Sequence, residues 1–308
     1  MTKSFRYFKL TLLLFAIVFV ATRCRHENKS EGETILKGTV TVISDATLTP
    51  IVEDQIAVFE NEYDAHIKLI SKSEAEAINM LINDSLQIAI LSRDLTKDEQ
   101  RLFKGKKIMP RVTKFATDGI TFIRYKKGSD TIIDLKSVID FVKGLNGTNI
   151  KGLVFDNLNS STARYIAELS GIKQLPEKGI YSFTTNEDVI KYVSENVGMI
   201  GVIGLNWVTQ PSAQMQPFID NISVLSVKGM TDSIYYSPTQ NNLAEGKYPL
   251  ARDLFIVNCQ GYSGLGMGFA SFIAGEKGQR IILKSGLLPQ RIPSRKILLR
   301  NQIEKSNK

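Results

Sequence analysis

Three short polar clusters in this sequence stand where a predicted strand gives way to a predicted helix. They occupy residues 44–48, 92–94 and 157–162. The first turn of a helix presents free backbone N–H groups and the positive end of the helix dipole, so it binds anions. Ser and Thr hydroxyls add hydrogen-bond donors without adding charge. The clusters therefore predict a binding site for a small anion.

Clusters of Ser, Thr and Asn also cap helices without binding a ligand, and for a single cluster this is the simpler interpretation. Three clusters in register with alternating strands and helices favour a site, because ligands of open α/β sheets bind at the carboxyl ends of the strands. Arg93 adds a forked donor that suits tetrahedral oxyanions. The candidate ligand-binding residues are Ala46, Thr47, Leu48, Ser92, Arg93, Asp156, Asn159, Ser160, Ser161 and Thr162.

Other kinds of site have little support in the sequence. Histidine occurs only at His26 and His66, so a His-based catalytic triad and a multi-histidine metal site are not expected. The glycine-rich run at 261–268 lacks the G-x-G-x-x-G spacing of dinucleotide loops, since Phe269 stands in the place of the third glycine. We therefore expect a protein that binds its ligand without catalysis, metal or cofactor.

The elements that must position these clusters alternate along the chain. Strands are predicted at 38–43, 67–70 and 86–91, and helices after Thr49-Pro50 and after two capping boxes, at 73–76 and 96–99. Further strands are predicted at 120–125, 152–155, 180–183, 199–203 and 254–257, and helices at 135–142, 161–169, 187–193, 267–273 and 278–283. This order predicts an α/β fold with helices on both faces of a mostly parallel sheet.

Two stretches stand apart from this alternation. Residues 209–250 are rich in Ser, Gln, Asn and Pro and give no clear element pattern. Cys259 lies in an apolar stretch and is expected to be a small buried hydrophobe.

The N-terminus has the features of an export signal. Lys3, Arg6 and Lys9 precede an almost purely apolar run at 10–20, which is shorter than the roughly 20 residues of a membrane-spanning helix. Cys24 then resembles the acylated cysteine of a lipoprotein, although Arg23 stands where that pattern has Gly, Ala or Ser. We expect an exported protein with a lipid on Cys24. An uncleaved anchor and a free thiol are the alternatives.

The charge balance excludes a nucleic-acid partner. The formal net charge is +8, and removal of residues 1–23 with their four basic and no acidic residues lowers it to +4. The sequence has no block of Lys and Arg interleaved with aromatic residues, which nucleic-acid binding usually shows. Residues 25–34 are polar and are expected to form a tether between the anchor and the fold.

Residues 37 to 298 resemble the phosphate-binding proteins of ABC transporters and their lipoprotein relatives. Four passages carry the resemblance: 90–99 is similar to a Ser-Arg-x-Leu-x-x-x-Glu passage, 155–162 to a Gly-Ser-Gly-Thr anion loop, 197–202 to a Gly-x-Ile-Gly strand, and 248–252 to the return crossing between lobes. The resemblance implies a two-lobe, type II periplasmic-binding fold that holds its ligand by hinge closure.

The sequence departs from this family in two ways. Asn159 and Ser161 replace the glycines of the anion loop. Many members also place an Asp in the second cluster and an Arg ahead of the third, whereas here Arg93 and Asp156 stand in the opposite order. We therefore expect an Arg93–Asp156 ion pair across the cleft, with Asp156 accepting the proton of a protonated phosphate, a role that sulfate cannot use. The alternative is that Asp156 only caps a turn.

The sequence thus predicts an exported, lipid-anchored monomer that captures phosphate or a related oxyanion for an ABC transporter permease. A sensory or adaptor lipoprotein of the same fold is the alternative. The expected domains are a signal peptide at 1–23, a tether at 24–36, lobe 1 at 37–118 and again at 251–300, lobe 2 at 119–250, and a tail at 301–308.

Overall fold

The structure is a computed structural model that describes residues 33–127, 130–145, 147 and 149–293. The predicted signal peptide, Cys24, most of the predicted tether and the predicted tail lie outside the described residues. Every described helix and strand belongs to the part from Thr34 onward. Among the described residues, no helix has both the length and the apolar character needed to cross a membrane.

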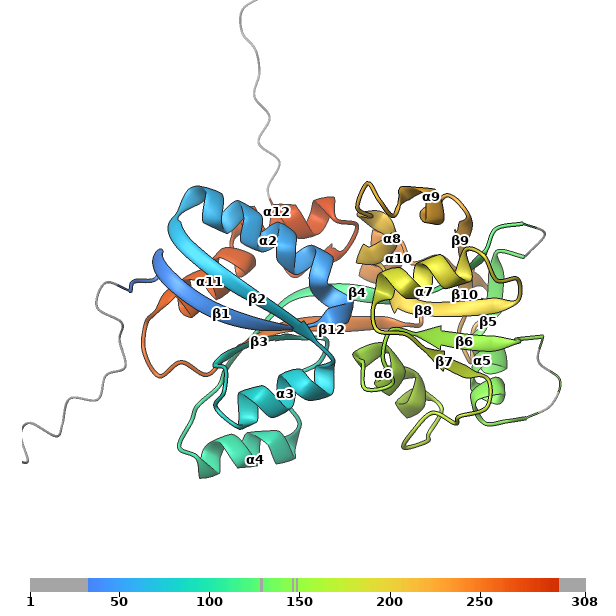
Figure 1. Ribbon diagram of the computed structural model, residues 1–308, viewed down its shortest axis with the longest axis horizontal. Coiled ribbons are helices and arrows are strands. Elements are labelled where there is room, and N and C mark those ends of the chain that lie inside the picture. Colours follow the sequence, from blue (N-terminus) through green and yellow to red (C-terminus); the bar gives the residue numbers. More distant parts are fainter. Residues whose placement is uncertain (1–32, 128–129, 146, 148, 294–308) are drawn as a thin grey trace, which may run out of the picture. The chain divides into compact units, whose positions relative to one another are not determined.

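One curved path of strands organises the molecule (Figure 1). Its order is β2 (Asp64–Lys72), β1 (Lys37–Asp45), β3 (Ile88–Leu91), β12 (Ala251–Asn258), β4 (Arg111–Tyr125), β8 (Met199–Gly204), β6 (Gly152–Phe155) and β7 (Ile180–Ser182). The strands on each side of β12 and β4 pair in parallel, whereas those two central strands pair antiparallel with their neighbours. The predicted α/β class is confirmed, and the sheet is mixed, with parallel pairing among the outer strands of each lobe.

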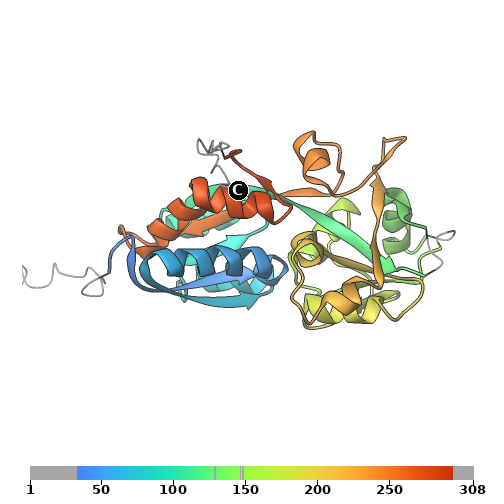
Figure 2. The ribbon, with the colours of Figure 1, turned by 90° about the horizontal axis from the view of Figure 1, so that it is seen from above.

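Strand β4 joins two halves of this path, which we call lobe 1 and lobe 2. Residues 111–119 of β4 pair with β12, and residues 120–124 pair with β8. Lobe 1 is the half on the β12 side, and lobe 2 is the half on the β8 side. The two strands that run between the lobes are therefore β4 and β12, as Figure 2 shows from above. The sequence had predicted only residues 120–125 of β4.

Helices cover both faces of the lobe 1 sheet. Successive side chains of its strands point to opposite faces, and those on both faces are buried. Val42 contributes to the cluster that also contains Phe59 and Phe269, on the face of α2 (Thr49–Glu62), α11 (Leu265–Ala274) and α12 (Glu276–Lys284). Its neighbour Ile43 joins Leu81 in the cluster of α3 (Glu74–Ile82) and α4 (Lys97–Gly105). A strand turns successive side chains to opposite faces, so one apolar run serves both layers.

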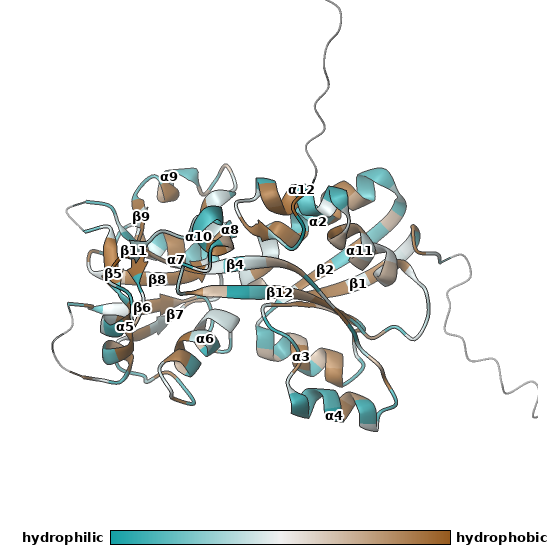
Figure 3. Ribbon diagram, turned by 180° about the vertical axis from the view of Figure 1, so that it is seen from behind, coloured by the Kyte–Doolittle hydropathy of each residue, from teal (hydrophilic) through white to brown (hydrophobic). Residues whose placement is uncertain are grey.

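Lobe 2 repeats this design with its own helices. Strand β6 directs Leu153 and Phe155 toward the cluster of α5 (Leu135–Val142) and α6 (Ser161–Leu169), and Val154 toward that of α7 (Asn186–Val193) and α9 (Gln216–Ile219). Figure 3 shows the hydrophobic strands between more hydrophilic helices. A helix carries one apolar stripe to the sheet and turns its polar side outward.

The stretch 209–250, which the sequence left open, forms short elements at one side of lobe 2. They are α8 (Asn206–Thr209), α9, β9 (Ile222–Val224), β10 (Ser226–Lys228), β11 (Tyr235–Tyr236) and α10 (Gln240–Ala244). Strands β11 and β10 form a small separate sheet with β5 (Ile132–Asp134), while β9 pairs with β4. The last described strand, β13 (Leu288–Pro289), also pairs with β4. Elements of two to five residues leave too little periodicity to predict.

Helix starts were predicted well where the side chains form the cap. Both capping boxes are present, with Ser73 and Glu76 at α3 and Thr96 and Glu99 at α4. The helix expected after Thr49-Pro50 starts earlier, at Thr49 itself. Thr49 is the first residue of α2, and its hydroxyl donates to the carbonyl of Ala46 at 3.0 Å because a short 3-10 helix, η1 (Ala46–Leu48), precedes α2 directly.

Two other local predictions concern Cys259 and the glycine-rich run. Cys259 is a buried free thiol, as predicted, and burial raises its pKa to about 12. At Gly268 a Cβ atom would lie 1.6 Å from the backbone oxygen of Ile35. This glycine therefore lets the chain ahead of β1 pack against α11.

Candidate functional site

Thr47 stands at the carboxyl end of β1, where lobe 1 meets lobe 2. Asp45 holds it in place: one carboxylate oxygen accepts from the Thr47 backbone N–H at 3.1 Å and the other from its hydroxyl at 2.9 Å. Ala46, Thr47 and Leu48 form η1 just ahead of α2, and the last two are buried. The first predicted cluster therefore lies at a helix start, as expected.

Ser161 stands at the matching position in lobe 2, as the first residue of α6. Ser160 caps that helix by accepting from the Ala163 backbone N–H at 3.4 Å. The hydroxyls of Ser160 and Thr162 lie 3.0 Å apart and bond to each other. The Ser161 hydroxyl instead lies 3.0 Å from the hydroxyl of Thr47. Two helix starts from different lobes thus meet through a pair of hydroxyls.

Arg252, on the connecting strand β12, joins this pair. Its Nη1 donates to the Ser161 hydroxyl at 2.7 Å, and its Nη2 donates to the Thr47 hydroxyl at 3.1 Å. The other side of the guanidinium donates to one oxygen of Asp118 in β4, from Nε at 3.0 Å and from Nη2 at 2.8 Å. Only 2% of the Arg252 side chain and none of Asp118 is exposed. Asp118 therefore orients a buried cation toward both lobes.

The carboxyl groups around this cation are strongly affected by burial. Burial raises the pKa of Asp118, although the charge of Arg252 opposes this. Burial also raises the pKa of Asp45 to about 6, and the nearby Glu74 adds to the rise. Burial likewise raises the pKa of Asp156. A carboxyl group with a raised pKa stays protonated to a higher pH. These groups therefore present less negative charge to an anion that enters the site.

Asp156 follows β6 and points into the same buried region. Its Oδ2 accepts from the Asn186 amide at 3.2 Å. Its Oδ1 is buried and has no hydrogen-bond partner among the described residues. A buried acceptor without a partner is costly and therefore uncommon in proteins. Asp156 thus keeps one acceptor available in the buried region.

The expected ion pair between Arg93 and Asp156 is wrong. Arg93 donates to Glu99 through both terminal nitrogens at 2.8 Å, and its Nε donates to Glu74 at 3.1 Å. Glu99 is fixed at the start of α4 by the capping box, so it draws the guanidinium along lobe 1 and away from Asp156. Ser92 also turns toward Glu74, donating to it at 2.8 Å. The second cluster therefore surrounds a carboxylate of lobe 1.

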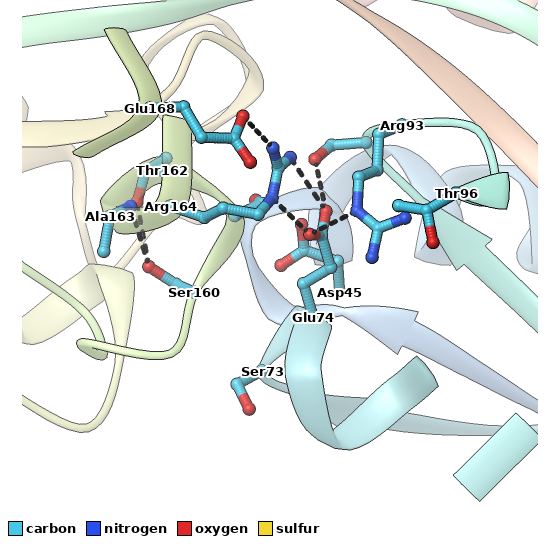
Figure 4. Close-up of polar contacts among 12 residues, drawn as sticks. Asp45, Ser73, Glu74, Arg93, Thr96, Ser160, Thr162, Ala163, Arg164 and Glu168 are labelled. Atoms are coloured by element: carbon cyan, nitrogen blue, oxygen red, sulfur yellow. Dashed lines mark hydrogen bonds and ion pairs between the residues drawn. The ribbon is translucent and has the colours of Figure 1, made fainter. Parts of the chain in front are cut away.

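Glu74 in turn reaches across to lobe 2. Its side chain is 3% exposed and accepts from Nε of Arg164 in α6 at 2.6 Å, while Arg164 also donates to Glu168 at 2.7 Å. Figure 4 shows Arg93 and Arg164 approaching Glu74 from the two sides. This network borders a pocket of about 740 Å³ whose lining includes Asn159. The structure thus places Arg93 in a second polar group around Glu74, and Asn159 in the lining of the adjacent pocket.

The replaced glycines of the anion loop cause no backbone strain. Asp84 and Lys107 are the non-glycine residues with positive φ in the described part of the chain, so Asn159 and Ser161 adopt ordinary backbone angles. Asn159 donates its backbone N–H to the side chain of Asn157 at 2.8 Å, which forms the turn ahead of α6. Glycine is required only where φ is positive or where a Cβ would clash.

Sequence reasoning missed the central pair, Arg252 and Asp118. A signal was present, because each is a charged residue inside an apolar strand, at 250–257 and at 115–123. Figure 3 shows the corresponding hydrophilic stretch near the start of β12. Opposite charges in two buried strands indicate a pair, since an unpaired buried charge is very costly. Glu74 and Arg164 were also missed, and for Trp207 the sequence left a place in the core and a place along a cleft equally open. Trp207 donates to the backbone oxygen of Thr47 at 3.0 Å.

Comparison with known sequences identifies the protein family to which this fold and site belong. Residues 29–277 match the family model of the PBP superfamily domain, so the chain belongs to that superfamily. The phosphate-binding protein PstS of Borreliella burgdorferi is 27% identical over 272 residues, which cover 81% of this chain and 89% of the relative.

Solved structures show the same fold. A protein of Clostridium perfringens, assigned as a phosphate ABC transporter substrate-binding protein and solved with bound phosphate, matches with a TM-score of 0.66 and 20% identity. An ABC-type phosphate transport receptor from Vibrio cholerae matches with a TM-score of 0.59 and 16% identity. Each match covers 82% of this chain and 100% of the other. The predicted type II periplasmic-binding fold is confirmed.

Proposed function

We propose that this protein captures inorganic phosphate between its two lobes and delivers it to an ABC importer. The observation that carries the proposal is the meeting of Thr47, Ser161 and Arg252, which brings two helix starts and a guanidinium together from both lobes. Phosphate has four oxygens, so it fits between donors that converge from several directions. The named relatives, which are phosphate-binding and phosphate-transport proteins, support this ligand.

The contacts at this site suit reversible binding. The hydroxyls and the backbone N–H groups at the starts of α2 and α6 donate without carrying charge, and among the described residues Arg252 is the cation that contacts the Thr47 and Ser161 hydroxyls. Burial in a region of low dielectric strengthens each of these hydrogen bonds. We propose that the protein performs no chemistry on its ligand.

Asp156 is proposed to select phosphate over sulfate. Phosphate carries a proton near neutral pH and sulfate does not, so an acceptor without a partner favours phosphate. The support is the buried Oδ1 of Asp156, together with the Asn186 amide that holds the other carboxylate oxygen. The Asp156→Asn variant offers an amide in the same space. It should lose at least part of the preference for phosphate, and an unchanged ratio of affinities in a titration would exclude this role.

The location of the protein is part of the proposal. The signal at 1–23 would export the chain, a lipid on Cys24 would hold it at a membrane, and residues 25–34 would tether a monomeric two-lobe body. Mass spectrometry of the membrane-bound protein tests the anchor. A diacylglycerol-modified N-terminal peptide that begins at Cys24 is the expected result, and an unmodified Cys24 contradicts it.

Calorimetry tests the ligand. Residues 25–308 include every described contact, so this soluble form is titrated with phosphate, arsenate, sulfate and molybdate. Binding of one phosphate per chain, weaker or equal binding of arsenate and no binding of sulfate are expected. No heat with any oxyanion would refute the proposed function.

A further inference from the structure

Asn206 is a buried residue of lobe 2 whose surroundings do not explain its side chain. It is the first residue of α8, directly after the turn that follows β8. None of its surface is exposed. Neither its Oδ1 nor its Nδ2 has a hydrogen-bond partner among the described residues. A buried amide lacking both of its interactions lowers the stability of a fold, so such groups call for an explanation.

The amide lies beside the candidate phosphate site. A Cβ atom added to Gly204 would be 2.8 Å from the Oδ1 of Asn206, 2.9 Å from the carbonyl oxygen of Thr47 and 3.2 Å from the Nη2 of Arg252. These three groups therefore surround the same point. The Thr47 carbonyl already accepts from Trp207, and the Arg252 Nη2 already donates to Thr47 and Asp118. Asn206 is the member of this group whose polar atoms remain unused.

Gly204 makes this approach possible. A Cβ atom at this position would lie closer to the Asn206 Oδ1 and the Thr47 carbonyl oxygen than real Cβ atoms come to such neighbours, and would make a tight contact with the Arg252 Nη2. The absence of a side chain at Gly204 thus leaves the amide facing Thr47 and Arg252. Close approach to a ligand is one of the uses of glycine in proteins.

We propose that Asn206 is a ligand-contacting residue that recognises a protonated tetrahedral oxyanion. Its Nδ2 would donate to a charged phosphate oxygen, and its Oδ1 would accept from a phosphate hydroxyl. A carboxamide offers both roles on one planar group, which neither Arg252 nor a hydroxyl at a helix start can do in fixed positions. The inference rests on the proposed function, because it adds a residue to the same phosphate site.

The test uses the full chain and two leucine variants. Asn206→Leu replaces the amide by an apolar group of similar size. Gln279→Leu is the matched control: its buried amide donates to the backbone oxygens of Phe115 and Ile273 and accepts from the Arg291 N–H. Thermal unfolding is followed without and with phosphate, and phosphate affinity is measured by calorimetry.

For Asn206→Leu, we expect the midpoint without phosphate to equal or exceed that of the unchanged protein, because no protein hydrogen bond is lost. Phosphate affinity should fall by about tenfold or more, as for the loss of one or two good hydrogen bonds. Gln279→Leu should show the reverse pattern, with a lower midpoint and unchanged affinity.

The inference is overturned if Asn206→Leu binds phosphate within twofold of the unchanged protein, or if it loses thermal stability as the control does. The second result would mean that ordered water or the fold itself uses the amide. If Asn206→Leu does not fold, Asn206→Ala is judged by affinity alone against the same twofold limit. Failure of the unchanged protein to bind phosphate refutes the proposed function itself, which separates the two claims.

Discussion

At the scale of single residues, the buried pair of Arg252 and Asp118 dominates the site. Each partner is needed by the other, because a charge removed from water is tolerated only with a compensating partner and hydrogen bonds. Asp118 also accepts from the backbone N–H groups of Gly119 at 2.8 Å and Leu205 at 3.2 Å, so it links β4 to the turn after β8. The pair thus combines the proposed ligand contact with the joining of the lobes.

Replacement of Arg252 should therefore cost both stability and binding. Arg252→Met leaves Asp118 buried without its cation, and we expect the free energy of unfolding to fall by about 3–5 kcal/mol. Urea denaturation measures this loss. Arg101→Met is the control, since Arg101 pairs with Asp98 on the surface, where an ion pair contributes about 0–1 kcal/mol. Equal losses for the two variants would contradict the account.

Asp45 should make stability depend on pH in an unusual direction. Its pKa is raised to about 6 in the folded protein, above its ordinary value of 3.8, because it is buried and lies near Glu74. The folded state therefore binds this proton more tightly than the unfolded state. The stabilisation is complete below about pH 4 and is lost as the pH rises through about 6.

Asp45→Asn cannot titrate, so it isolates this effect. The stability of the variant minus that of the unchanged protein should rise by about 2 kcal/mol between pH 4 and pH 7. Urea denaturation at several pH values measures the difference. A difference that stays constant or falls with pH would show that the Asp45 carboxyl is not held in this way.

At the scale of elements, the starts of α6 and α7 offer a matched comparison. Ser160 caps α6 and Thr185 caps α7, each by accepting from the backbone N–H three residues later. Only α6 begins at the candidate site. Ser160→Ala and Thr185→Ala should each lower the free energy of unfolding by about 1 kcal/mol.

Phosphate affinity should separate the two cap variants. Ser160→Ala weakens the geometry of the helix start that faces the ligand, so affinity should fall severalfold, whereas Thr185→Ala should leave it unchanged. Calorimetry measures both. Equal affinities for the two variants would show that the α6 cap has no part in binding.

Most elements could be predicted from the sequence because their signals are local. The capping boxes at Ser73 and Thr96 depend on residues three apart, and buried strands such as β3 and β6 are short apolar runs. The partner of Arg93 could not be predicted in the same way. Glu99 is its near neighbour in sequence, but Glu74 comes to it only through tertiary packing of α3. The predicted Arg93–Asp156 ion pair is wrong because the contact of Arg93 with Glu74 depends on tertiary packing, which no local pattern in the sequence shows.

At the scale of the whole fold, several contacts join the two lobes. Thr47 meets Ser161, Trp207 reaches the Thr47 carbonyl, and Arg164 of α6 binds Glu74 of α3. The partners of each pair are far apart in sequence, so no local sequence pattern predicts these contacts. The α/β class was accessible from the alternation of elements, and the two lobes were expected from the family resemblance, while the domain limits at 118/119 and 250/251 stay a prediction.

Loss of the Glu74–Arg164 contact should weaken closure without removing a proposed ligand donor. Arg164→Ala leaves Glu74 paired with Arg93, so the fold should persist, and phosphate affinity should fall severalfold because less free energy favours the closed lobes. Small-angle scattering with and without phosphate tests this effect. The variant should need more phosphate to reach the compact state, and a titration identical to that of the unchanged protein would show that this contact does not contribute to closure.

The proposed function places phosphate in contact with Thr47, Ser161 and Arg252, the side chains that bond to one another across the two lobes. Equilibrium dialysis with radioactive phosphate, in the presence of a large excess of sulfate, tests it most directly. The account predicts one phosphate bound per chain, undiminished by sulfate and lost in Arg252→Met. The absence of bound phosphate, or its displacement by sulfate, would contradict the account.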